Sequence, residues 1–279
     1  MNMQGTGLTW VFDLDNTLHN ASPHIFPHLN RAMTQYLQDH LALDEAAADS
    51  LRDHYWQRYG ATLQGLVRHH GTKPDHFLWH THQFPALERM VLRERGLRAA
   101  LLRLRGRKIV YTNAPAFYAE AVLRLLRIDD LFAGVFSIEG AGYRPKPDPQ
   151  GFYRLFRSWR LAPQRCVMVE DSPGNLRTAK RLGMKTVLVG AASKRVAGVD
   201  ISLCSVLELP RAQKDSQTTG ETMATKPGER KLQILQVLAE MLQQPQGEKS
   251  PPLHWLHGSR FRRRRCTVIS PARRRCSKA

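Results

Sequence analysis

The chain has 279 residues, of which 42% are hydrophobic, and a formal net charge of +18. This length fits one large domain or two ordinary ones, and no apolar run reaches about 18 residues, which excludes a hydrophobic membrane-spanning helix. A strand is predicted almost at the N-terminus, and the four cysteines lack the paired spacing of metal ligands. We therefore expect a cytoplasmic protein without a signal peptide.

The positive charge is distributed unevenly along the chain. Residues 1–215 carry 29 Lys and Arg against 20 Asp and Glu, whereas residues 216–279 carry 13 against 4. The mild excess in the first part would attract anionic substrates. The dense excess in the second part requires an explanation of its own.

The first predicted element is an apolar strand that begins at Trp10 and ends in Asp13 and Asp15. Because the strand stops at this point and the chain turns, both carboxylates can face one pocket. Two buried acids are costly unless they hold a metal or take part in chemistry. The alternative is a simple turn that happens to contain aspartates.

Helical patterns fill the next part of the chain. Apolar residues recur at helical spacing over four segments, namely 24–40, 44–59, 61–70 and 74–82. The last two segments also contain five histidines and two aromatic residues: His69, His70, His76, Phe77, Trp79, His80 and His82. Such a surface could stack on a nucleobase. The alternatives are a second metal site and histidines that merely face solvent.

Strands and helices then alternate. An amphipathic segment at 98–107 leads into a strand at 107–112. The later segments are a helix at 115–127, a strand at 134–137, a helix at 149–159, a strand at 166–169, a helix at 173–182, and strands at 185–189 and 199–204. This alternation predicts an α/β fold with a doubly wound parallel sheet and helices on both of its faces.

Polar residues follow the strands at three further points. They are Thr112 and Asn113, then Lys146 in a proline-rich loop, and then Glu170 and Asp171. Ligands of open α/β sheets bind at the carboxyl ends of the strands, which is where these residues are expected to meet. Each has a structural alternative, as a helix cap or as a solvated loop lysine. The ordered set favours a catalytic site.

Together these four segments resemble the motifs of the haloacid dehalogenase superfamily, over residues 8–205. The resemblance implies a catalytic core formed by residues 1–17 and 100–210. It also implies a helical cap, residues 18–99, inserted after the first strand. A lid of this kind excludes water and contacts the substrate.

The resemblance also implies phosphate-ester hydrolysis with Mg²⁺ as cofactor. A carboxylate can attack phosphorus and form an aspartyl-phosphate, and we assign this role to Asp13. Asp15 would protonate the leaving oxygen and later deprotonate the attacking water. By resemblance, Mg²⁺ would be held by the Asp13 carboxylate, the Asp15 backbone carbonyl and Asp171, with Glu170 acting through a water.

The phosphoryl oxygens require their own donors. By resemblance these are the Thr112 hydroxyl, the backbone at Asn113 and the positive charge of Lys146. Lys146 thereby belongs to both the catalytic and the phosphate-binding sets.

Within the superfamily, three runs look like bacterial pyrimidine 5′-nucleotidase-type proteins. They span residues 12–19, 58–63 and 70–77. We therefore expect pyrimidine nucleoside 5′-monophosphates as substrates, with His76 and Phe77 as contacts from the cap. The catalytic motifs leave two alternatives open, a phosphatase for sugar phosphates or phosphoglycolate and a mutase.

The C-terminal part differs in character. Residues 211–226 are polar and predict a linker, and an amphipathic helix follows Met223. Residues 223–249 resemble the start of a TetR-type nucleoid occlusion factor. The pattern is then lost and runs of arginine follow, which predicts a disordered basic tail within residues 227–279. We interpret this part as a fused and frame-shifted gene. The alternative is a basic arm that binds nucleic acid nonspecifically through phosphates.

Overall fold

The computed structural model describes residues 7–190 and 196–218, with side chains described as far as Gln213. Within these ranges the chain forms a parallel six-stranded sheet in the order β3-β2-β1-β4-β5-β6. The strands are β1 (Thr9–Phe12), β2 (Arg107–Tyr111), β3 (Val135–Phe136), β4 (Cys166–Glu170), β5 (Lys185–Val189) and β6 (Ile201–Leu203). The predicted α/β fold with a doubly wound parallel sheet is confirmed.

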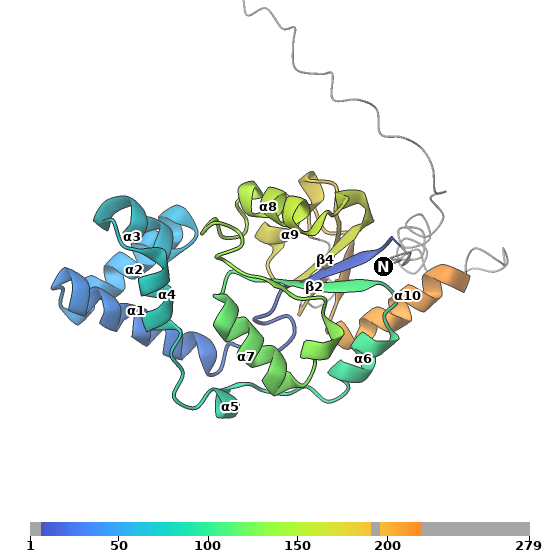
Figure 1. The fold of residues 1–279 in the computed structure, drawn as a ribbon, viewed down its shortest axis with the longest axis horizontal. Coiled ribbons are helices and arrows are strands. Elements are labelled where there is room, and N and C mark those ends of the chain that lie inside the picture. Colours follow the sequence, from blue (N-terminus) through green and yellow to red (C-terminus); the bar gives the residue numbers. More distant parts are fainter. Residues whose placement is uncertain (1–6, 191–195, 219–279) are drawn as a thin grey trace, which may run out of the picture. The chain divides into compact units, whose positions relative to one another are not determined.

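Helices cover both faces of this sheet because its central strands are buried on both sides. Trp10 and Phe12 of β1 point to one face, and Val11 between them points to the other. The first face packs against α6 (Leu97–Arg103), α7 (Ala116–Leu126) and α10 (Leu209–Thr218). The second packs against α8 (Pro149–Trp159) and α9 (Pro173–Arg181). Figure 1 shows these two layers of helices on opposite sides of β2 and β4.

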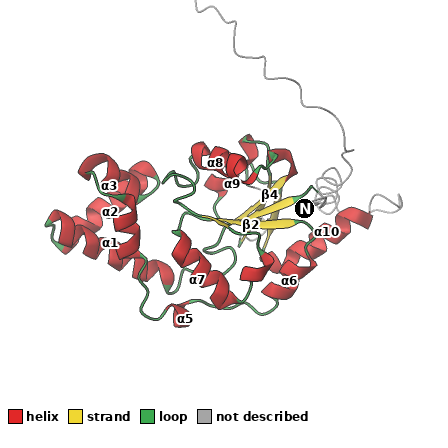
Figure 2. Ribbon diagram, viewed as in Figure 1, coloured by secondary structure: helices red, strands yellow, loops and turns green. Residues whose placement is uncertain are grey.

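A helical insertion follows β1. It contains α1 (Ile25–Leu41), α2 (Glu45–Tyr59), α3 (Thr62–His70) and α4 (Pro74–Thr81), and a short helix α5 (Leu87–Met90) comes after it. The four helices match the predicted segments within one residue at each end. We call α1 to α4 the insertion; Figure 2 shows them as helices joined by loops, beside the strands of the sheet.

The insertion has a hydrophobic core of its own. Its buried members include Tyr36, Leu37, Tyr55 and Phe77. Helices α2 and α3 approach closely at Gly65, where an added Cβ would lie 2.1 Å from the ring of Tyr55. By contrast, three residues early in the expected cap are buried in the core of the sheet: Leu18, Ala21 and Ile25. The first turn of α1 therefore packs with the sheet.

Helix α10 corrects the prediction of a linker from residue 211, because the helix continues to Thr218. The buried Gln213 side chain ties the helix to the loop before β2. Its Oε1 accepts a hydrogen bond from the Arg105 backbone N–H at 3.1 Å, and its Nε2 donates to the Arg105 carbonyl at 3.3 Å. These contacts satisfy both backbone groups of Arg105, and composition does not reveal them.

The rest of the C-terminal part, including the segment after Met223 and the arginine runs, lies outside the described residues. Among the described helices, none is long and apolar enough to cross a membrane.

Candidate active site

The site begins at the point where the strand order reverses. Strand β1 lies between β2 and β4, and Phe12 is in register with both Val110 and Val169. The Asp13 backbone N–H donates to the Val169 carbonyl at 2.9 Å, which extends the β1–β4 pairing by one residue. Residues that follow these strands consequently emerge at one edge of the sheet. In doubly wound sheets this crevice is the usual ligand site.

Lys146 is the centre of this edge. Its Nζ donates to Asp13 Oδ1 at 2.6 Å, to Glu170 Oε2 at 2.7 Å and to the Tyr111 carbonyl at 2.9 Å. The side chain is 1% exposed. This burial excludes the alternative of a solvated loop lysine. The residues predicted from three separate segments are thus in direct contact.

Asn113 holds the loop that carries Lys146. Its Oδ1 accepts from the Lys146 backbone N–H at 2.7 Å, and its Nδ2 donates to the Lys146 carbonyl at 3.1 Å. The paired bonds fix the backbone at both ends of the residue. The sequence predicts only a backbone role for Asn113, because nothing in the local pattern indicates that its side chain reaches a loop 33 residues later.

The electrostatics of the site favour an additional cation. Burial, and then the charge of Glu170, raise the pKa of Asp13 to about 7. Burial also raises the pKa of Glu170 and of Asp171. Burial disfavours the charged form of Lys146, but the charges of Asp13 and Glu170 outweigh it and raise the pKa of Lys146. One lysine therefore does not neutralise the three acids.

The three carboxylates also have the geometry of a cation site. Asp13, Glu170 and Asp171 each offer an oxygen, and the three atoms lie within 4.8 Å of one another. A purely oxygen donor set suits hard divalent cations. The residues therefore fit the group that the sequence motif implies.

Asp15 has two hydrogen-bond donors that were not predicted. The Tyr118 hydroxyl donates to Asp15 Oδ1 at 2.7 Å, and His19 Nε2 lies 2.9 Å from the same oxygen. Burial, and then the charge of Asp15, raise the pKa of Tyr118, so the hydroxyl keeps its hydrogen. Tyr118 is 103 residues away in sequence, which explains why no local pattern could indicate it.

Thr112 is buried at the end of β2. Its Oγ1 accepts from the Ala114 backbone N–H at 3.0 Å. Because the oxygen is the acceptor in this bond, the hydroxyl hydrogen remains available to a ligand. Thr112 can therefore stabilise the turn with its oxygen and still donate to a phosphoryl oxygen, so the two roles do not exclude each other.

Of the two substrate contacts predicted for the cap, Phe77 is buried, whereas His76 lies at an exposed position of α4. Phe77 is 3% exposed and packs edge-on against the Tyr36 ring in the core of the insertion. His76 Nδ1 forms a hydrogen bond of 2.9 Å with the Tyr36 hydroxyl. Phe77 has this position because it fills the space between α1 and α4. In the part of the chain that the structure describes, the group with metal-binding geometry is the acidic one, and no histidine belongs to it.

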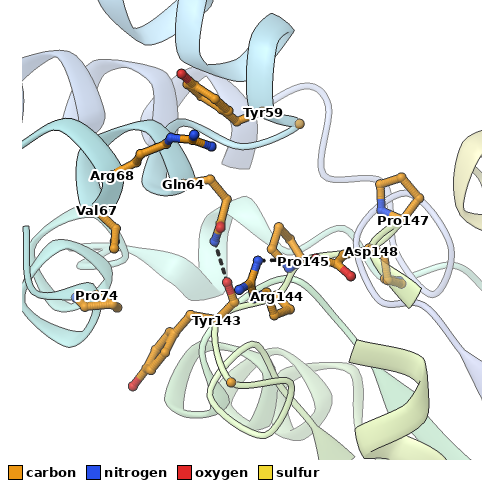
Figure 3. A pocket seen from close by; sticks show the side chains of 13 residues that line it. Tyr59, Gln64, Val67, Arg68, Pro74, Tyr143, Arg144, Pro145, Pro147 and Asp148 are labelled. Carbon is orange, nitrogen blue, oxygen red and sulfur yellow. Dashed lines mark hydrogen bonds and ion pairs between the residues drawn. The ribbon is translucent and has the colours of Figure 1, made fainter. Parts of the chain in front are cut away.

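A pocket of about 820 Å³ lies between the insertion and the loop that carries Lys146 (Figure 3). It is lined by Tyr59, Gly60, Gln64, Val67, Arg68, Pro74, Gly142, Tyr143, Arg144, Pro145, Lys146, Pro147 and Asp148. The Gln64 side chain donates to the Tyr143 carbonyl across it. The Arg68 guanidinium lies 5.8 Å from the centre of the Tyr59 ring. The pocket is therefore basic and partly aromatic. No pattern in the sequence indicates that Arg68 and Arg144 line the same pocket.

His82, at the end of α4, should make the stability of the protein depend on pH. Burial is the main cause that lowers its pKa to about 4, from 6.5. The unfolded chain therefore takes up the proton first as the pH falls through 6.5, and stability is lost progressively down to about pH 4. Because the ring is partly exposed, we expect a loss of about 1 to 2 kcal/mol between about pH 7 and about pH 5.

Urea unfolding of His82→Phe measures this effect. The variant should lose less stability over that interval than the unmodified protein, because phenylalanine does not titrate and suits the neighbouring rings of Phe84 and Tyr118. His54→Phe, at an exposed position of α2, is the matched control. An unchanged pH dependence in His82→Phe would contradict the assignment.

Sequence comparisons relate the chain to two known proteins. Phosphate metabolism protein 8 of Saccharomyces cerevisiae is 25% identical over 196 residues, which are 64% of this chain and 60% of that protein, so the chain spans less than two thirds of it. A phosphoglycolate phosphatase of Rhodospirillum rubrum is 28% identical over 217 residues, covering 71% of this chain and 86% of that protein.

A solved structure also has the same fold. The crystal structure of an HAD phosphatase from Thermococcus onnurineus has a TM-score of 0.54 at 19% identity and covers 73% of this chain and 96% of its own. Residues 9–183 match the family model of haloacid dehalogenase-like hydrolases. With more than half of its length matched, and with the acids and the lysine together at the switch point of the sheet, the chain belongs to the haloacid dehalogenase-like hydrolase family.

Proposed function

We propose that the protein is a Mg²⁺-dependent phosphatase that hydrolyses small phosphate monoesters through an aspartyl-phosphate at Asp13. The observation that carries this proposal is the buried contact of Lys146 with Asp13 and Glu170, next to Asp171. Such a site combines a nucleophile, a fixed positive charge and carboxylates for a cation. These are the requirements of in-line phosphoryl transfer.

The reaction follows from the roles of two aspartates. A carboxylate oxygen of Asp13 attacks phosphorus, and the bond from phosphorus to the leaving oxygen breaks. Asp15 gives its proton to that oxygen and the alcohol departs. Asp15 then takes a proton from a water, whose oxygen attacks the phosphorus. Inorganic phosphate leaves and the Asp13 carboxylate is restored.

The other residues bind and orient the phosphoryl group. The Thr112 hydroxyl and the backbone N–H at Asn113 donate to its oxygens, and Lys146 offsets their charge. Asp13, the Asp15 carbonyl and Asp171 would hold the cation, with Glu170 acting through a water. When bound, Mg²⁺ neutralises charge on the phosphoryl oxygens and orients the group.

For the substrate we propose pyrimidine nucleoside 5′-monophosphates. The three runs of pyrimidine nucleotidase type support this choice. So does the pocket beside Lys146, in which Tyr59 and Arg68 offer planar surfaces on which a base could stack. A cytoplasmic location is part of the proposal, because the described cysteines, Cys166 and Cys204, are free thiols.

A second candidate substrate is a small acid phosphate such as phosphoglycolate. The Rhodospirillum rubrum relative carries this name. The arginines of the pocket, Arg68 and Arg144, are suited to a carboxylate as well as to a base. The two candidates share the catalytic centre and differ only in the leaving group.

The test is phosphate release by the full chain with Mg²⁺, measured against pyrimidine and purine monophosphates, phosphoglycolate and sugar phosphates. Preference for pyrimidine monophosphates, lost on chelation with EDTA and restored by Mg²⁺, is the expected result. Preference for phosphoglycolate would keep the mechanism and replace the substrate. No release from any ester by folded protein would refute the proposed function.

Arg68→Ala should weaken binding of the preferred substrate and leave the chemical step intact. We expect KM to rise about tenfold with kcat nearly unchanged, because the pocket contacts the leaving group before and during the reaction alike. Arg58→Ala, at a position of α2 outside the pocket, is the control. An unchanged KM in Arg68→Ala would remove this arginine from the substrate site.

A further inference from the structure

Two buried side chains, Tyr118 and His19, contact the carboxyl group of Asp15 from the side of the core. We propose that both are positioning residues, which orient this carboxyl for proton transfer to the leaving group. The inference rests on the proposed phosphatase function and extends it to two residues to which the sequence analysis assigns no role.

Both contacts are made with the same oxygen. The Tyr118 hydroxyl lies 2.7 Å and His19 Nε2 lies 2.9 Å from Asp15 Oδ1. An ionised carboxylate only accepts, so the hydroxyl and the imidazole must both donate. With two donors on Oδ1, the proton that Asp15 transfers is carried by Oδ2. The pair therefore determines which oxygen acts as the acid and the direction in which it points.

Tyr118 is held rigidly by its surroundings. The side chain is 1% exposed, and its ring centre lies 5.2 Å from that of Phe84 and 5.7 Å from that of His82. Phe84 and His82 belong to the segment that leaves the insertion after α4. Packing from this segment and the turn of α7 together fix the position of the hydroxyl. A carboxyl bonded to it cannot rotate freely.

His19 provides independent support. It is 4% exposed, and a backbone bridge joins it to Asp15. Its Nδ1 is buried and has no hydrogen-bond partner among the described residues. An unpaired buried nitrogen costs free energy, so packing alone would favour an apolar side chain here. The contact with Asp15 is the interaction that accounts for an imidazole at this position.

The leaving group distinguishes positioning of an acid from a structural role. The alkoxide of a nucleotide or sugar phosphate is a poor leaving group, so it needs the proton of Asp15 to depart as an alcohol. The nitrophenolate of p-nitrophenyl phosphate is stable as an anion and departs without it. Disturbing the acid should therefore slow the first type of substrate selectively.

The experiment compares kcat/KM of the full chain with Mg²⁺ on an alkyl phosphate and on p-nitrophenyl phosphate, because kcat/KM reports the steps up to departure of the leaving group and not the later attack of water. For Tyr118→Phe and for His19→Leu we expect kcat/KM on the alkyl phosphate to fall about 10-fold to 100-fold. We expect kcat/KM on p-nitrophenyl phosphate to fall less than about threefold. His19→Gln, which retains a donor, should recover part of the loss.

Tyr55→Phe is the matched control, since it removes a tyrosine hydroxyl that bonds within the insertion, to His70 Nε2 at 2.8 Å. It should change neither substrate selectively. Equal losses on both substrates, or no loss on the alkyl phosphate, would overturn the inference. If Tyr118→Phe fails to fold, the two His19 variants decide the question. Unmodified protein that turns over neither ester would refute the proposed function instead.

Discussion

The Asp13→Asn variant should release no measurable phosphate, a loss of at least about 10³-fold in kcat, while keeping its fold. An amide cannot attack phosphorus to form the acyl phosphate, and the amide is close to the carboxylate in shape. The measurement is phosphate release with Mg²⁺ on the substrate that the unmodified protein prefers. Retained turnover would show that Asp13 is not the nucleophile.

The stability of this variant gives a second expected result. The pKa of Asp13 rises from 3.8 to about 7 on folding, mainly through burial. The protonated form therefore favours the folded state, and this contribution is present below 3.8 and lost as the pH rises through about 7. Near pH 8, without divalent cations, the charged Asp13 carboxylate destabilises the fold, whereas the neutral amide of the variant would not.

We therefore expect the Tm of Asp13→Asn, measured in EDTA near pH 8, to equal or exceed that of the unmodified protein. Adding Mg²⁺ should raise the Tm of the unmodified protein more than that of the variant, because cation binding to the folded state stabilises it. Asp39→Asn, at an exposed position of α1, is the control for the loss of one negative charge. A lower Tm in EDTA would show that Asp13 stabilises the fold.

Lys146→Met is expected to lose both activity and stability, in contrast to Asp13→Asn. The variant removes the cation that bonds to Asp13 and Glu170 and leaves the two carboxylates facing each other. Breaking a buried ion pair on one side costs about 3 to 5 kcal/mol, which corresponds to a fall in Tm of about 10 °C in a domain of this size. Without the lysine, no positive side chain from this position offsets the charge of the phosphoryl oxygens, which should lower kcat about 10²-fold or more.

A double variant separates the two effects. Asp13→Asn with Lys146→Met removes one of the opposed acids, so its Tm should lie above that of Lys146→Met alone, while activity stays absent. Millimolar Mg²⁺ should raise the Tm of Lys146→Met by neutralising the remaining carboxylates. If Lys146→Met kept the Tm and kcat of the unmodified protein, the central position of this lysine would have no energetic or catalytic consequence.

The cluster of acids and lysine at the edge of the sheet could be predicted because its residues occupy local patterns. Asp13 directly follows β1, Thr112 follows β2 and Glu170 ends β4. In a parallel sheet every such end lies on one edge, so the alternation of strands and helices suffices to bring the residues together. Lys146 could be predicted for a different reason, because the prolines before and after it indicate a constrained loop.

The missed features depend on contacts between distant side chains. Phe77 belongs to a run that could have faced a ligand, and only its packing on Tyr36 decides that it is buried. The tie between Gln213 and Arg105 explains why α10 continues into a segment with the composition of a linker. Hydrophobic periodicity contains no information on such partners.

Spacing within short segments was sufficient to predict the succession of strands and helices and to place the acids and the lysine at the edge of the sheet. Three further features depended on the folded chain: the contact of Tyr118 with Asp15, the hold of Asn113 on the Lys146 loop, and the lining of the pocket. Each joins segments that are far apart in sequence, and they become neighbours through the packing of helices on the sheet and of the insertion beside it.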